Sequence, residues 1–310
     1  MEKLSFENQS YQKHAEHFRM YARGGERSDG TNSWFEKGTL LEESVNNRHK
    51  ISDPILEYFP GSSWITIGDG RFGSDANYLI SKGASALATD ISEFLLKEGK
   101  EMNYIKDYAV VNAEQIQYPD GSFDFALCKE AYHHFPRPMK ALYEMLRISR
   151  KGVILLEPVD QYIYGSIFQL LFRKMIAILN SIGVIKLLSG RQIQKHTYEE
   201  VGNYVYKISI RELEKVALGL SYQILAYKPV SMVPLTGLEK VKVHQRNKIW
   251  FRYRLLTAMQ TFLAACKLIE PALLSVIILK IEPEELLIKT LKKHKYKVIL
   301  LPKAPQCENK

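Results

Sequence analysis

Short apolar runs alternate with helical segments between residues 63 and 158, and this alternation constrains the fold more than any other feature. Its period and turn residues predict strands at 64–67, 86–90, 108–112, 123–128 and 152–158, with helices at 74–82, 92–104 and 136–149. Strands that alternate with helices usually form a parallel sheet with helices on both faces. The predicted fold class is therefore α/β.

The second half of the chain is predicted to complete the same sheet. Strands are expected at 221–230 and 272–281, helices at 210–220 and 284–294, and a short closing strand at 296–301. Two basic, apolar-rich stretches, 162–188 and 239–269, are predicted as helical insertions outside the sheet. We expect a seven-stranded, mostly parallel sheet in which residues 1–60 form a helical lid or leader, 61–160 the core and 161–310 the completion.

The composition is that of an ordinary globular protein, with 46% hydrophobic and 25% charged residues. No apolar run reaches the roughly 20 residues of a membrane span, and the polar start MEKLSFENQSYQKH does not resemble a secretory signal, so a cytoplasmic protein is expected. Cys128, Cys266 and Cys307 are odd in number and far apart. We therefore predict neither a disulfide nor a metal site.

The basic charge belongs to the second half of the chain. Residues 1–150 carry 18 Lys and Arg against 22 Asp and Glu, whereas residues 151–310 carry 25 against 12. Such a surplus attracts phosphates, nucleic acid or anionic lipid, and spare surface lysines explain it equally well. No zinc finger, RNA-recognition signature or dense arginine stripe is present, so no nucleic-acid partner is predicted.

A glycine loop follows the first predicted strand. The sequence GDGRFG places Gly68, Gly70 and Gly73 between that strand and the first helix, where glycine allows a sharp turn and close approach to a ligand. Asp90 ends the second strand, where a carboxylate can accept hydrogen bonds from two ribose hydroxyls. The pattern predicts an adenosine-type site, but it also fits a nicotinamide-dinucleotide fingerprint or a purely structural turn.

One of these interpretations is favoured by residues 111–135, which have the sequence VNAEQIQYPDGSFDFALCKEAYHHF. This segment resembles the type 11 branch of class I methyltransferases that use S-adenosylmethionine (SAM), with its D-A-E-x-L-P-F-P-D-x-S-F-D pattern and ALHHF-like stretch. The resemblance covers roughly residues 60–160 and implies a Rossmann-like fold with a cofactor-binding core at 61–160. The organisation is also similar to methyltransferases of bacterial surface-polysaccharide gene clusters, which implies that 161–310 forms the acceptor side.

The resemblance implies cofactor contacts at seven positions, Gly68, Gly70, Gly73, Asp90, Ile91, Asn112 and Ala113, and the loop residues Asp69 and Lys129 are two further candidates. The glycines would wrap the methionine part of SAM, Asp90 would hold the ribose, and Ile91 would pack on the adenine. Asn112 stands where the family usually has Asp, and Thr66 stands where it usually has an acid. Asp69 is therefore expected to take over part of that acid's work on the ammonium group of SAM.

A hydroxyl acceptor would need a base, for which histidine is the usual choice. His133 and His134 follow the fourth predicted strand, so one of them is the predicted base, with packing or pocket lining as the alternative. Lys129 would contact the cofactor or an anionic acceptor, or face solvent. Tyr198 and Tyr204 could stack on a sugar or lie in a surface hairpin, while Tyr11 lies in a segment that resembles the family's leader helix.

These inferences predict SAM-dependent methyl transfer, at oxygen, to a small molecule or glycan that carries phosphate or carboxylate, such as a nucleotide-linked or lipid-linked sugar. An NAD(P)-dependent oxidoreductase or epimerase and a non-catalytic cofactor-binding module are the alternatives. The basic helices at 162–188 and 246–268 could rest on an anionic membrane, bind the acceptor, contact a second subunit or pack over the sheet.

Overall fold

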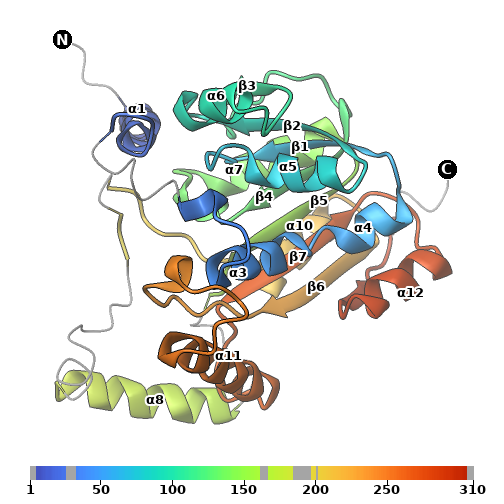
Figure 1. Cartoon of the computed structure of the whole chain (residues 1–310). Coiled ribbons are helices and arrows are strands. Elements are labelled where there is room, and N and C mark those ends of the chain that lie inside the picture. Colours follow the sequence, from blue (N-terminus) through green and yellow to red (C-terminus); the bar gives the residue numbers. More distant parts are fainter. Residues whose placement is uncertain (1–4, 26–32, 161–166, 184–196, 200–201, 306–310) are drawn as a thin grey trace.

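The computed structural model describes residues 5–25, 33–160, 167–183, 197–199 and 202–305. Within these residues eight strands form one sheet in the order β3-β2-β1-β4-β5-β7-β6-β8 (Figure 1). The strands are β1 (Ser63–Ile67), β2 (Ser85–Asp90), β3 (Tyr108–Val110), β4 (Phe123–Lys129), β5 (Ser149–Pro158), β6 (Ile224–Val230), β7 (Leu273–Leu279) and β8 (Lys297–Leu300). The α/β class is confirmed.

The sheet differs from the predicted one in strand number and direction. Strands β1 to β5 pair in parallel, but β7 runs antiparallel to both β5 and β6, and β8 runs antiparallel to β6. The prediction of a seven-stranded, mostly parallel sheet is therefore wrong in these details. A buried apolar run has no feature that encodes its direction, so the sequence pattern located these strands without orienting them.

Helices cover both faces of the sheet. Their bounds are α1 (Phe6–His17), α3 (Leu40–His49), α4 (Asp53–Tyr58), α5 (Ser74–Ser81), α6 (Phe94–Glu101), α7 (Pro138–Ile148), α8 (Ile167–Ser181), α10 (Ile210–Gly219), α11 (Lys248–Ala265) and α12 (Glu285–Lys293). Short 3₁₀ turns are η1 (Phe18–Met20), η2 (Ser33–Phe35), η3 (Tyr132–His134) and η4 (Leu238–Lys240).

The core has one layer on each side of the sheet. On one face α7 and α10 bury residues such as Met145 and Leu213 against the strands. On the other face α4, α5 and α12 do the same with Ile55, Leu79 and Leu287. This alternation of buried side chains positions the carboxyl ends of β1, β2, β3 and β4 at one edge, where ligands of parallel α/β sheets usually bind.

Two helices lie outside this layered core, α8 and α11 (Figure 1). They correspond to the two predicted insertions, although residues 161–166 and 184–196 lie outside the described part of the chain. The second insertion is shorter than expected, because η4 and a loop occupy residues 238–247 before α11 begins. Among the described helices, none combines the length and the apolar character that crossing a membrane requires.

Candidate functional site

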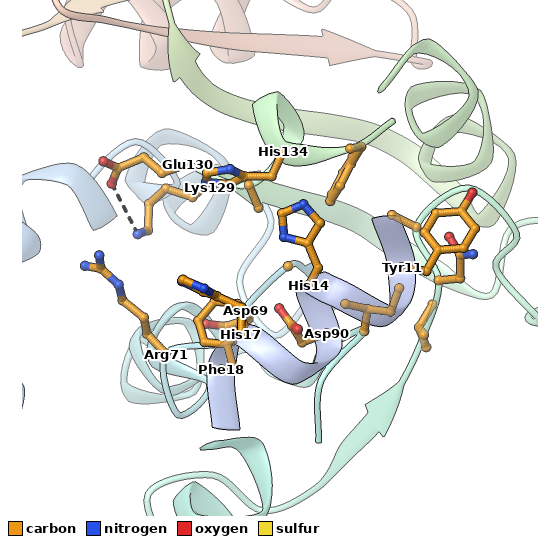
Figure 2. A pocket seen from close by; sticks show the side chains of 18 of the residues that line it. Tyr11, His14, His17, Phe18, Asp69, Arg71, Asp90, Lys129, Glu130 and His134 are labelled. Atoms are coloured by element: carbon orange, nitrogen blue, oxygen red, sulfur yellow. Dashed lines mark ion pairs between the residues drawn. The ribbon is translucent and has the colours of Figure 1, made fainter. Parts of the chain in front are cut away.

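A cavity of about 490 Å³ opens at the carboxyl edge of the parallel strands (Figure 2). Its walls combine the loops after β1, β2, β3 and β4 with α1, η1 and parts of the chain near residues 34 and 199. Of the predicted cofactor positions, the cavity is lined by Gly68, Asp69, Gly70, Asp90, Ile91, Asn112, Ala113 and Lys129. The structure therefore brings together residues from four separate strand ends.

The glycine loop leaves no space for side chains. Gly68 has a left-handed backbone (φ +74°), and a Cβ there would lie 2.3 Å from the Cβ of Ala131. A Cβ on Gly70 would lie 2.8 Å from the Oδ2 atom of Asp90. Gly73 does not line the cavity: its left-handed backbone turns the chain into α5, and a Cβ there would lie 2.7 Å from Ile105. Its position indicates a packing role and gives no support to the predicted cofactor contact.

Asp90 places a carboxylate at the floor of the cavity. The backbone N–H of Ser92 donates a 2.8 Å hydrogen bond to its Oδ1 atom, which fixes the side chain at the end of β2. Burial raises the pKa of Asp90 to about 6. Hydrogen bonds from the surrounding backbone N–H groups act in the opposite direction and lower this pKa. At neutral pH the carboxylate is therefore mostly ionised and can accept hydrogen bonds from a ligand.

Asp69 holds the start of α5. Its carboxylate accepts hydrogen bonds from the backbone N–H groups of Asp75 (3.1 Å) and Ala76 (2.9 Å) and from the hydroxyl of Thr66 (2.9 Å). Burial, together with the nearby carboxylate of Asp75, raises its pKa well above the usual value. Both oxygens thus already have protein partners, and the expected contact with an ammonium group stays a prediction.

Glu114 joins the N-terminal helix to the core. Its buried carboxylate accepts a 2.8 Å hydrogen bond from the hydroxyl of Tyr11 on α1. It also accepts from the backbone N–H (2.7 Å) and Nε (2.6 Å) of Arg137, the residue before α7. Beside it, the side-chain oxygen of Asn112 accepts a 2.9 Å hydrogen bond from the backbone of Glu114. These contacts hold α1 against the cavity, which Tyr11 and Phe18 both line.

The two histidines of the predicted pair have different surroundings. His134 lines the cavity, and its Nδ1 atom pairs with Oε1 of Glu199. His133 is not among the lining residues; its Nδ1 atom lies 2.6 Å from Oε2 of Glu157, a fully buried carboxylate that also accepts from the backbone N–H of Tyr132. His133 therefore helps to fix the loop, and only His134 faces the cavity.

A second imidazole lies next to His134. The ring of His14 on α1 is 5.9 Å from the ring of His134, and its Nε2 atom lies 3.4 Å from Oε2 of Glu199. Burial lowers the pKa of His14 to about 4, and burial together with the neighbouring imidazoles lowers the pKa of His134. Both rings are therefore neutral near pH 7, and the bond to Glu199 leaves Nε2 of His134 as the unprotonated nitrogen.

Positive charge gathers at one end of the cavity (Figure 2). The Nζ atom of Lys129 lies 3.1 Å from Oδ1 of Asp75 and 3.7 Å from Oε2 of Glu130, so the positive charge of Lys129 is balanced by carboxylates. Arg71 places its guanidinium 4.8 Å from the ring centre of Trp34, and it makes no ion pair within the described residues. Arg71 can therefore attract an anionic group of a ligand.

Several site residues were not predicted from the sequence as members of the site. His14, Arg71 and the Glu199 carboxylate line the cavity, and Glu114 fixes α1 without having been assigned a role. The spacing of Tyr11, His14 and Phe18 places them on one face of α1 and of the η1 turn that continues it, and this is the signal that could have identified His14. Tyr198 and Tyr204 pair as an isolated antiparallel bridge, although residues 200 and 201 lie outside the described part.

Comparison with known proteins gives a family match over the core. Residues 65–156 match the family model described as "Methyltransferase domain". The curated "Probable methyltransferase ltbC" of Aspergillus luteorubrus is 31% identical over 127 residues, which are 37% of this chain and 43% of that protein. A "Demethylmenaquinone methyltransferase" of Renibacterium salmoninarum is 29% identical over 93 residues, which are 30% of this chain and 39% of that protein. The chain thus spans less than half the length of these relatives.

Among solved structures, the 1,6-didemethyltoxoflavin-N1-methyltransferase of Burkholderia thailandensis is similar over most of both chains. It was determined with bound 1,6-didemethyltoxoflavin and S-adenosylhomocysteine. It is 10% identical, the match covers 91% of this chain and 93% of that chain, and the TM-score is 0.49. The family match is the finding that bears on chemistry: residues 65–156 match the model of a methyltransferase domain.

Proposed function

We propose that this chain transfers a methyl group from SAM to an oxygen atom of a small acceptor held in the cavity. The observation that carries the proposal is a shared cavity: the Gly70–Asp90 cradle and the His134–Glu199 pair line the same space. A cradle for adenosine and a neutral base for an acceptor are the two parts that this reaction needs.

The described residues fit SAM as a cofactor. The missing side chain of Gly70 leaves the Asp90 carboxylate open to the cavity, as a ligand with two vicinal hydroxyls requires. Ile91 and Ala113 offer apolar surface for an adenine ring. Arg71 would attract the carboxylate of the methionine part. The family match at residues 65–156 stands against the alternative of a nicotinamide dinucleotide.

The protein itself needs to perform little covalent chemistry in this reaction. Bound SAM supplies a methyl group on a positively charged sulfur, which a nucleophile displaces directly. Nε2 of His134 would accept the proton of the acceptor hydroxyl as the new carbon–oxygen bond forms, and Glu199 would stabilise the resulting imidazolium through Nδ1. Helix α1 would exclude water, because Tyr11 and His14 cover the cavity.

The acceptor that the site supports best is anionic. Arg71 is assigned to the methionine carboxylate of SAM, but residues 151–310 carry 25 Lys and Arg against 12 Asp and Glu, a surplus that attracts anionic compounds. This surplus supports a glycan or other small hydroxyl compound that carries phosphate or carboxylate. The name of the Renibacterium relative suggests a quinone-type acceptor instead, and the two candidates differ in charge.

Ligand binding tests the cofactor part of the proposal. Thermal unfolding is followed with S-adenosylhomocysteine (SAH), NAD and NADP, each in excess. A ligand at 100 times its dissociation constant stabilises the folded state by about 2.7 kcal/mol. We expect stabilisation by SAH alone; stabilisation by a dinucleotide alone would contradict the proposal.

Label transfer tests the reaction. The protein is incubated with SAM carrying a labelled methyl group and with two acceptor pools, one of anionic sugars and one of quinols. We expect label in the anionic pool and identify the methylated atom by mass spectrometry. Label in the quinol pool would favour the second acceptor, and SAH binding with no label in any pool would favour the non-catalytic module.

A further inference from the structure

Helix α8 exposes an apolar stripe to solvent. Five of its side chains and one in the turn after it are between 46% and 66% exposed: Ile167, Phe168, Leu171, Met175 and Ile178 in the helix, and Ile182 after it. Their spacing places all six within about a third of the helix circumference. The opposite side faces the protein, because Gln169 is buried. An apolar stripe on the outer side of a surface helix needs a covering partner.

Helix α11 carries a second stripe of the same kind. Four side chains spaced three or four residues apart are between 48% and 68% exposed: Phe251, Leu255, Met259 and Phe262. Lys248 and Arg252 are exposed on the same side of the first turns. We call the ten apolar side chains of the two stripes the apolar docking face.

Helices α8 and α11 lie at the same end of the molecule, away from the sheet (Figure 1). Glu270, five residues past the end of α11, accepts a hydrogen bond from Gln169 of α8 and is attracted to Arg173 of the same helix. The connection keeps α8 close to the end of α11. The apolar docking face is therefore built from neighbouring parts of the fold.

The charge around this face is mostly positive, although Glu36, Glu43 and Glu270 lie beside it. Residues 167–183 contain two basic residues and no Asp or Glu, and residues 240–269 contain seven Lys and Arg and no Asp or Glu. Arg254 and Lys242 pair with Glu43 and Glu36, but Lys174, Lys248 and Arg252 have no ion-pair partner among the described residues. A second copy of the chain would bring like charges together, whereas an anionic lipid surface complements them.

We propose that the apolar docking face binds the chain to the surface of an anionic membrane. The apolar side chains would enter the boundary between headgroups and acyl chains, and the lysines and arginines beside them would contact lipid phosphates. Neither α8 nor α11 is long and apolar enough to cross a bilayer. This inference goes beyond methyl transfer and does not depend on it.

Vesicle flotation tests the proposal. The full chain is mixed with vesicles of phosphatidylcholine alone or of phosphatidylcholine with phosphatidylglycerol. We expect binding to the anionic vesicles only, and binding that weakens as salt screens the charges. The double variant Ile178→Gln/Leu255→Gln and the double variant Lys248→Glu/Arg252→Glu should each weaken binding by about tenfold or more.

A matched control uses equally exposed apolar residues elsewhere. Leu286 on α12 and Leu300 on β8 are 65% and 56% exposed, so Leu286→Gln/Leu300→Gln should leave vesicle binding unchanged. An unchanged circular dichroism spectrum and an unchanged thermal unfolding midpoint verify that each variant is folded. If the docking-face variants bind anionic vesicles as the wild type does, the proposal is wrong. It is equally overturned if light scattering shows a dimer that these variants dissociate while vesicle binding is absent.

An exposed cysteine allows a site-specific readout. Cys266 follows α11 and is exposed, whereas Cys128 is buried; Cys307, outside the described residues, is first replaced by serine. A polarity-sensitive fluorophore on Cys266 should shift to shorter wavelength when anionic vesicles are added. Vesicle binding without that shift would assign the membrane contact to another surface and contradict the proposal.

Discussion

The hydroxyl of Tyr11 lies 2.8 Å from the carboxylate of Glu114, although 103 residues separate them in the sequence. Glu114 is almost fully buried, and Arg137 supplies two further hydrogen bonds to the same carboxylate. This contact joins the helix that covers the cavity to the strand end that lines it. The cover and the floor of the site are therefore energetically coupled.

Replacing Tyr11 by phenylalanine should weaken cofactor binding. The variant Tyr11→Phe removes a hydroxyl that donates to the Glu114 carboxylate and accepts from Nη2 of Arg137, a partly exposed pair of hydrogen bonds that we expect to contribute about 1 kcal/mol. We expect the dissociation constant of SAH to rise about fivefold in calorimetry. Tyr143→Phe, at a 49% exposed position on α7, should bind SAH as the wild type does. Equal affinities of all three proteins would exclude a role for α1 in closing the cavity.

The elevated pKa of Asp90 predicts that SAH binding depends on pH. Burial raises this pKa from 3.8 to about 6, so the ionised carboxylate destabilises the free protein as pH rises between these values. Ribose hydroxyls bind the ionised form, so affinity should be retained above about pH 6 and lost below it, by roughly tenfold per pH unit. Calorimetric titrations between about pH 5 and about pH 8 measure this dependence.

The variant Asp90→Asn distinguishes the pH effect of this carboxylate from that of neighbouring carboxyl groups. The variant cannot ionise, so its SAH affinity should be weaker and nearly independent of pH. Asp69 is the other buried carboxyl group with a raised pKa in the cavity. A pH dependence that persists in Asp90→Asn would transfer the effect to Asp69.

Strand ends, together with the resemblance to the methyltransferase family, predicted which residues line the glycine-loop side of the cavity. Gly68, Asp90 and Asn112 each come directly after a short apolar run, and parallel pairing brings such positions to one edge. The same logic placed Gly73 in the cavity, where it is not found. Its contact with Ile105 depends on how α5 packs, and spacing within the loop does not show this.

The catalytic side could not be predicted to the same extent. His14 and Glu199 lie 185 positions apart, and no local pattern links them to His134. The amide nitrogen of Asn203 contributes to the arrangement by lying within 2.8 Å of both His14 Nε2 and the carbonyl oxygen of His134. Only tertiary packing of α1 against the chain near residue 200 creates this group of side chains. The distinct roles of His133 and His134 have the same origin.

Removing the imidazole of His134 should affect rate far more than affinity. A general base contributes about 100- to 10,000-fold, so His134→Ala should lower the methyl-transfer rate by that factor, with SAH affinity changed by less than about threefold. Because burial lowers the pKa of His134, the base stays unprotonated at pH 6.5, and its protonation should not lower the rate of the wild type there. Initial rates of label transfer give the comparison.

His133 provides the internal control for that experiment. His133→Ala removes the partner of the buried Glu157 carboxylate, so it should lower the free energy of unfolding rather than the rate per folded molecule. Glu199→Gln keeps a hydrogen-bond acceptor for His134 but loses the charge, and an intermediate rate is expected. A larger rate loss in His133→Ala than in His134→Ala would reverse the assignment.

Alanine substitutions at Gly73 and Gly83 distinguish two contributions to the free energy of unfolding. One is the collision of an added methyl group, and the other is the strain of a left-handed backbone. Both glycines have φ above +70°, but a Cβ on Gly83 meets nothing within 4 Å, whereas one on Gly73 meets Ile105 at 2.7 Å. Gly83→Ala should therefore lower the free energy of unfolding by about 1 kcal/mol, and Gly73→Ala by about 2–4 kcal/mol. Urea unfolding with unchanged m-values measures both. In an Ile105→Ala background, the cost of Gly73→Ala should fall toward that of Gly83→Ala, because the closest contacts are gone and only the Cβ of Ala88, at 3.1 Å, remains. If the cost of Gly73→Ala does not fall there, the contact with Ile105 is not what makes residue 73 a glycine.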